Sequence, residues 1–234
     1  MHNKATMRQR IVAAAAALLA EGGREAVSTR SVSKAAGIQP PTIYRQFGDM
    51  QGLLDAVAAD GFEEYLQKKA RRERASDPVE DLRRGWDLHV DFGVAHPEIY
   101  KIMFGQPRLG AEREAVARSF VILRGLVQRV AEAGRLTVSV ERAVHVIHAA
   151  ACGVVLTLVA TPPGQRDAGL SSCTREAVLA AVSTAATDGD TEEPPSAVAR
   201  AVAFKAMLPD LADSLTPGER ALLTEWLDRI TRAA

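Results

Sequence analysis

Hydrogen-bonding side chains gather between residues 39 and 46 of this 234-residue chain. They are Gln39, Thr42, Tyr44, Arg45 and Gln46. Hydroxyls, amides and a guanidinium are the groups that hydrogen-bond phosphate oxygens and the edges of nucleic-acid bases. Ile43 and Phe47 stand four residues apart, so both can anchor a helix to a core while the polar side chains face outward. The stretch therefore predicts a short helix whose outer face suits nucleic acid, with a plain solvated face as the alternative.

The residues around this stretch specify two short helices joined by a tight turn. Ser28 can cap a helix over residues 28–36 by accepting from its exposed backbone N–H groups. Gly37 stands where that helix must end, because glycine tolerates the left-handed conformation there. Pro40 and Pro41 can open the next helix, since the first helical turn needs no N–H donors. This order predicts a helix-turn-helix.

Charge is unevenly distributed, although the whole chain has 29 Lys and Arg against 29 Asp and Glu. Residues 1–47 carry seven Lys or Arg and two Glu, a net charge of +5, which leaves −5 for residues 48–234. A basic N-terminal segment on an acidic remainder favours a polyanionic partner that binds at one end.

Residues 7–57 resemble the DNA-binding domain of the tetracycline-repressor (TetR) family. The family pattern stands here as Ser28, Val32, the run Ala36-Gly37-Ile38 and the run Ile43-Tyr44-Arg45-Gln46-Phe47. The resemblance implies a transcriptional regulator, expected to be a repressor, that binds a palindromic or pseudo-palindromic operator in double-stranded DNA as a homodimer. A small, largely apolar effector is expected to release it.

The resemblance also implies roles for individual residues. Ser28 and Tyr44 are expected to hold phosphates. Gln39, Pro40, Thr42 and Arg45 are expected to approach the major groove, while Arg30 and Lys34 add positive charge. Family members usually have a Lys at the start of the fourth helix, where this chain has Met50. We expect one phosphate contact to be missing there, which is about one unit of the salt-dependence slope.

No stretch has the alternation of a β-strand, so we expect an all-α protein. Residues 1–55 are predicted to form a three-helix DNA-binding domain, joined by a fourth helix to a larger helical ligand-binding and dimerisation domain over residues 56–234. Helices are expected near residues 6–20, 28–36, 40–47, 50–74, 78–96, 97–104, 111–133, 138–160, 171–186, 196–208 and 216–232. A polar, breaker-rich linker is expected over residues 187–195.

The segment over residues 85–105 resembles one C-terminal subtype of the same family, which implies a small-molecule cavity. Large aromatic and sulfur side chains with a few polar groups suit an adaptable apolar pocket. The predicted ligand-binding residues are Trp86, His89, Tyr100, Met103, Phe104 and His148. Ordinary core packing is the alternative for each of them.

His145, His148 and Cys152 share one helical face, which leaves a soft-metal or redox sensor open as an alternative function. The repeated Cys and His pairs of a structural zinc site are missing, so neither a metal nor another cofactor is expected. Cys152 and Cys173 have no disulfide-type spacing, and a reducing cytoplasm suits them.

Small residues are frequent over residues 138–160 and 171–186, and the corresponding helices form a four-helix dimer interface in the family. Two short reading helices need a two-fold partner to reach half-sites that lie about 34–36 Å apart. A homodimer is therefore expected.

Residues 143–165 contain no Asp, Glu, Lys or Arg and are long enough to query as a membrane span. Because two histidines lie inside and two prolines end the stretch, we expect a helix buried between packed layers, and no membrane partner. The chain contains no GxSxG, GxGxxG, P-loop or HExxH motif, which argues against an enzyme. A helical-bundle enzyme or ligand carrier remains the alternative from a different class.

Overall fold

The computed structural model describes residues 6–71, 73–105, 114–184, 196–211 and 214–232. Throughout these ranges the chain forms helices and no strand, apart from one isolated bridge between Leu136 and Ser183, so the predicted all-α class is confirmed. The predicted linker over residues 187–195 lies outside the described residues.

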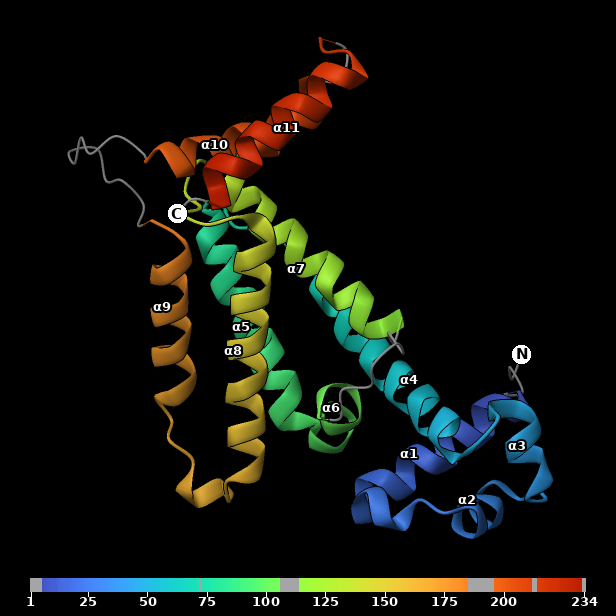
Figure 1. Cartoon of the computed structure of the whole chain (residues 1–234). Coiled ribbons are helices and arrows are strands. Elements are labelled where there is room, and N and C mark those ends of the chain that lie inside the picture. The colour runs from blue at the N-terminus through green and yellow to red at the C-terminus, as the bar shows by residue number, and fades with distance from the viewer. Residues whose placement is uncertain (1–5, 72, 106–113, 185–195, 212–213, 233–234) are drawn as a thin grey trace. The chain divides into compact units, whose positions relative to one another are not determined.

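The helices follow the predicted order closely (Figure 1). They are α1 (Met7–Ala26), α2 (Thr29–Ala36), α3 (Pro41–Phe47), α4 (Met50–Arg71), α5 (Pro78–Ala95), α6 (Pro97–Phe104), α7 (Glu114–Glu132), α8 (Val140–Ala160), α9 (Leu170–Val182), α10 (Ala197–Met207) and α11 (Pro217–Arg232), with short 3-10 turns at Pro163–Gln165 and Leu208–Leu211.

The described residues belong to two compact units. The first unit comprises Met1–Arg71 with Phe92–Arg118, and the second unit comprises Arg72–Asp91 with Ser119–Ala234. The helix-turn-helix predicted over residues 1–55 lies in the first unit, together with α4 and α6. The functional division at residue 55 stays a prediction.

Local sequence chemistry sets the boundaries of the first three helices. Thr6 and Gln9 form a capping box that opens α1, and helical geometry breaks at Gly22 and Gly23. Ser28 and Ser31 form a second capping box that opens α2. Gly37 ends α2 in the left-handed conformation at a φ of 62°, which only glycine adopts without strain.

A single apolar core supports these helices. Ile11, Ala15 and Leu19 of α1 pack with Val32 of α2 and Ile43 of α3. Leu53, Leu54 and Val57 of α4 complete the same cluster. The outer face of α3 is therefore held in place from behind by buried side chains.

Within the second unit, α8 and α9 run side by side (Figure 1). Helix α8 is long and apolar enough to cross a membrane by composition alone. One face of α8 is buried through residues such as Val144, Ile147 and Val155, whereas His145, Ala149 and Gly153 are exposed. The prediction of a helix buried between packed layers is therefore wrong for the face of α8 that carries His145, Ala149 and Gly153. Small side chains leave this face exposed.

Capping also decides where the helices of the second unit begin. Asp77 accepts from the backbone N–H of Val79 at 2.9 Å and so caps α5. Partial burial raises the pKa of Asp77, but this hydrogen bond and the Arg135 guanidinium at 2.5 Å outweigh it and hold the pKa below its ordinary value. Thr216 and Glu219 form a capping box that opens α11.

Candidate nucleic-acid interface and sensor site

The outer face of α3 presents the predicted DNA-contacting side chains to solvent. Gln39, Pro40 and Arg45 are exposed, Tyr44 is 50% exposed, and Thr42 is partly exposed. Ile43 has no exposed surface, so the helix is anchored on its inner side as its spacing predicted. This arrangement leaves hydroxyl, amide and guanidinium groups available to an external partner.

A side-chain contact that the sequence did not predict joins the N-terminus of α2 to this face. The Tyr44 hydroxyl lies 3.2 Å from Oγ1 of Thr29, which is the first residue of α2. The Ser28 hydroxyl accepts from the backbone N–H of Ser31 at 3.1 Å and lies 2.9 Å from the Ser31 hydroxyl. Ser28 is thus already engaged as a cap, while N–H groups of the first turn have no partner inside the helix.

The cations of the helix-turn-helix fall into two groups. Arg10 donates to the Ala36 carbonyl oxygen at 2.8 Å, and the Arg8 guanidinium lies 4.8 Å from the centroid of the Phe47 ring, so both brace the domain. Arg30, Lys34 and Arg45 are exposed, and no acidic side chain of the described residues pairs with them. These three charges are available to a polyanion.

The start of α4 explains what Met50 does in place of a basic residue. Asp49 Oδ1 accepts from the backbone N–H of Gly52 at 2.7 Å and so caps the helix. The Met50 side chain is partly buried and packs against the core of the helix-turn-helix. At this position an apolar contact replaces the charge that the family usually has.

The six predicted ligand-binding residues are divided between the two units. Trp86, His89 and His148 belong to the second unit, and Tyr100, Met103 and Phe104 belong to the first. Trp86, His89, Tyr100 and Met103 are buried, whereas Phe104 and His148 are partly buried.

Three of these residues lie in a polar and aromatic cluster within the second unit. The His89 and His148 rings lie 6.5 Å apart, and the Phe120 ring lies 4.3 Å from His148. The Trp86 indole donates to the Ser171 hydroxyl at 3.0 Å. We call Trp86, His89, Phe120 and His148 the histidine cluster. Phe120 and Ser171 were missed because no local pattern brings them to Trp86 and His148.

The other three residues lie in an aromatic cluster within the first unit. Tyr100 and Phe104 rings lie 4.7 Å apart, and Phe62 lies 6.0 Å from Phe104. Phe62 also contacts Phe92 at 5.2 Å, edge to face. Such pairs stabilise a core beyond their buried area, so these rings contribute to packing whatever else they bind.

The alternative metal-binding group does not assemble around α8. Cys152 Sγ lies 3.5 Å from Nε2 of His148, but the His145 side chain faces solvent. Across the part of the chain that the structure describes, no three His, Cys, Asp or Glu side chains are placed to hold a metal ion.

Two cavities have walls made of described residues, and none of the six predicted ligand residues lines either of these two. The first has a volume of about 180 Å³ and lies among α1, α4 and α6 in the first unit. The second has a volume of about 200 Å³ and lies among α7, α8, α10 and α11 in the second unit.

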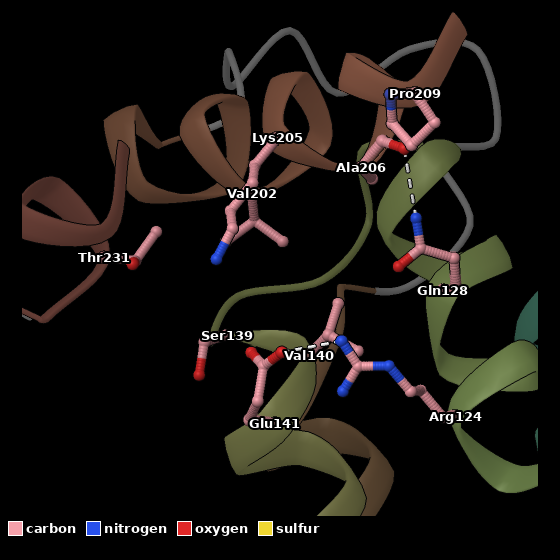
Figure 2. Close-up of a pocket in the computed structure, with 10 residues that line it drawn as sticks. All are labelled: Arg124, Gln128, Ser139, Val140, Glu141, Val202, Lys205, Ala206, Pro209 and Thr231. Carbon is pink, nitrogen blue, oxygen red and sulfur yellow. Dashed lines mark hydrogen bonds and ion pairs between the residues drawn. The ribbon is translucent and has the colours of Figure 1, made fainter. Parts of the chain in front are cut away.

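Six of the ten residues that line the second cavity are polar or charged, and hydrogen bonds join some of the lining residues (Figure 2). Arg124 donates to Glu141 at 2.8 Å, and Gln128 donates to the Ala206 carbonyl oxygen at 3.1 Å. Partial burial raises the pKa of Glu141, but Arg124 and Lys205 outweigh it and hold the pKa below its ordinary value. The charged side chains of this cavity, Arg124, Glu141 and Lys205, therefore already pair with residues of neighbouring helices.

Comparison with known proteins agrees with the family resemblance. Residues 11–57 match the family described as bacterial regulatory proteins, tetR family. No curated protein sequence matches the chain.

Solved structures of similar fold span both units of the chain. A tetR-family regulator from Shewanella sp. PV-4 has a TM-score of 0.59 and 17% identity, over 77% of this chain and 100% of that chain. RolR with its ligand resorcinol has a TM-score of 0.60 and 23% identity, over 84% of this chain and 92% of that chain. FadR from Bacillus subtilis with stearoyl-CoA has a TM-score of 0.59 and 19% identity, over 72% and 96%. Residues 11–57 thus match the tetR family of bacterial regulatory proteins, and the chain shares its fold with solved structures that include a tetR-family regulator.

Proposed function

We propose that this chain is a cytoplasmic, homodimeric transcriptional repressor that binds a palindromic operator and is released by a small, largely apolar effector. The observation that carries the proposal is the outer face of α3. It combines a fully buried anchor, Ile43, with exposed hydrogen-bonding side chains and the exposed Arg45. Arg30 and Lys34 are exposed on α2, and none of the three cations has an acidic partner among the described residues. A helix face that contacts only solvent does not require a buried anchor and exposed cations beside the N-terminus of α2.

The geometry suggests how phosphates are held. The first-turn N–H groups of α2 are natural anion donors, and the linked hydroxyls of Thr29 and Tyr44 lie next to them. We infer that Ser28 acts mainly by capping α2 and that Tyr44, with the backbone of α2, meets the phosphate. Gln39, Thr42 and Arg45 then reach base edges, with Pro40 packing beside them.

A homodimer is the second part of the proposal. The exposed face of α8 and the neighbouring face of α9 carry small side chains, including Ala149, Gly153, Ala177 and Ala181. Small residues allow close helix approach, so a second copy can cover these faces. This would also remove the exposed apolar side of α8 from water.

The effector is the third part. Structures with the same fold contain resorcinol or stearoyl-CoA, which supports an apolar or aromatic effector class. We propose that the histidine cluster contributes to the effector site, where imidazole and hydroxyl groups can orient a ligand among apolar walls.

Selection from a randomised pool of DNA duplexes tests the function directly. The proposal expects one enriched sequence with two half-sites about one helical turn apart and a complex of one duplex with two chains. Enrichment of no sequence, or turnover of a small molecule by the free protein, would favour a helical-bundle carrier or enzyme. Operator binding that depends on added metal or on thiol oxidation would instead favour a sensor that uses His148 and Cys152.

A further inference from the structure

The apolar cavity of the first unit lies directly behind the DNA-binding helices. Its walls come from Ala16, Leu19 and Ala20 of α1, from Val57 of α4 and from residues 95–99 around the start of α6. Three of the lining side chains are alanines, which end at Cβ and so leave space between the helices. We call this space the α1–α6 cavity.

The walls select an uncharged apolar ligand. His96 and Glu98 are the only titratable residues among the lining side chains. Glu98 already pairs with Lys101 at 2.7 Å, so its charge has a partner. An apolar cavity of roughly 150 Å³ is large enough to bind benzene in another protein. At about 180 Å³, the α1–α6 cavity has room for one such ring.

The cavity is coupled to the core behind α3 through two shared residues, Leu19 and Val57. Leu19 lines the cavity and is only 2% exposed in the core that also holds Val32 of α2 and Ile43 of α3. A ligand that presses on Leu19 therefore presses on the core behind α3.

The opposite wall of the cavity has little room to move. A Cβ placed at Gly61 of α4 would lie 2.5 Å from Cδ1 of Ile99, so α4 and α6 are in close contact there. By contrast, α1 loses helical geometry just beyond the cavity, at Gly22 and Gly23. A molecule that enlarges the cavity is accommodated most readily by movement of α1.

We propose that the α1–α6 cavity is a binding site for a small uncharged aromatic molecule, and that occupancy weakens operator binding by displacing α1 and the core behind α3. The regulatory part of this inference rests on the proposed function. The site is distinct from the histidine cluster, so it offers a second control point on the DNA-binding domain itself.

Binding of benzene to the full-length protein tests the site. NMR of the protein with benzene measures the affinity in the wild type and in Ala20→Leu, which adds three carbon atoms to a side chain that lines the cavity. Ala95→Leu fills the cavity from a different wall and is a second, independent variant. Ala17→Leu is the matched control, because Ala17 is exposed on α1 and does not line the cavity.

We expect benzene to bind the wild type and Ala17→Leu equally, and to bind both filled variants about tenfold more weakly or worse. Absence of binding to the wild type, or equal binding to the filled variants, overturns the site.

The regulatory part is measured on the selected operator duplex. Benzene should lower operator affinity by about 5-fold or more in the wild type, within the usual range of coupling between sites, and should have no effect in Ala20→Leu. An operator affinity that benzene leaves unchanged, or lowers equally in Ala20→Leu, overturns the coupling. Failure of the benzene-free protein to bind any duplex would instead contradict the proposed function and leave the NMR result to decide the site.

Discussion

Cations on the helix-turn-helix and cations at the helix contacts of the second unit have different surroundings. In the second unit, Arg83 and Arg175 pair with Glu176, Arg129 pairs with the buried Asp81, and Lys205 pairs with Asp228. On the helix-turn-helix of the first unit, Arg30, Lys34 and Arg45 are exposed without an acidic partner among the described residues. The difference shows which charges hold the protein together and which remain available to bind a partner.

We expect the largest effect on stability when the buried ion pair of Asp81 and Arg129 is broken. Asp81 is 1% exposed, contacts Arg129 and accepts from the backbone N–H of Ala75 at 2.7 Å. Asp81→Ala leaves Arg129 without its partner and should lower the free energy of unfolding by about 3–5 kcal/mol. Urea unfolding followed by circular dichroism measures the change.

The control is the exposed pair of Arg229 and Glu225, in which Arg229→Ala should cost no more than about 0.5 kcal/mol. Equal losses for Asp81→Ala and Arg229→Ala would remove the distinction between buried and exposed ion pairs in the second unit.

The next largest effect is expected at Arg45, a cation without an acidic partner among the described residues. Arg45→Ala should leave the unfolding midpoint unchanged but lower operator affinity by about 1–3 kcal/mol, because a guanidinium reading a base edge is lost. Competition by operators with single base changes should reveal relaxed preference at one position of each half-site. A loss of stability without a change in base preference would place Arg45 among the structural cations instead.

Tyr44→Phe should have a smaller and sequence-independent effect. Removal of the hydroxyl takes away one phosphate contact and the link to Thr29, which together should cost about 0.5–1.5 kcal/mol of binding free energy. Fluorescence anisotropy with operator and with unrelated duplex measures both affinities. A loss confined to the operator would mean that the hydroxyl reads a base rather than a phosphate.

Met50→Lys should produce the smallest change in binding. The added cation should steepen the salt-dependence slope by about one unit. Because Met50 packs against the core, the same substitution should also lower the unfolding midpoint. Met50→Leu keeps the apolar contact and serves as the uncharged control. An unchanged slope in Met50→Lys would show that α4 begins too far from the DNA backbone.

The sequence predicted features that depend on neighbouring residues. Ser28 and Gly37 mark helix boundaries through hydrogen bonds and backbone conformations within a few positions, so the helix-turn-helix and the all-α class followed directly. The anchors of α3 followed from a spacing of four residues.

Features that depend on tertiary contacts could not be predicted in this way. Nothing near Trp86 indicates that its indole meets Ser171, 85 positions away. Helical spacing alone also could not show that Tyr100 and Trp86 belong to different units, or that one side of α8 is open. The α1–α6 cavity was missed because its alanines look like ordinary helix formers in the sequence.

The most direct test of the central claim is a salt titration of operator binding by the wild type and by a variant with Arg30, Lys34 and Arg45 changed to Gln. If Arg30 and Lys34 meet phosphates while Arg45 reads a base edge, the logarithm of affinity falls linearly with the logarithm of salt concentration, by about 0.9 for each phosphate neutralised. The triple variant should then show a slope shallower by about two phosphate contacts. A flat line for the wild type, or the same slope for both proteins, would contradict the account.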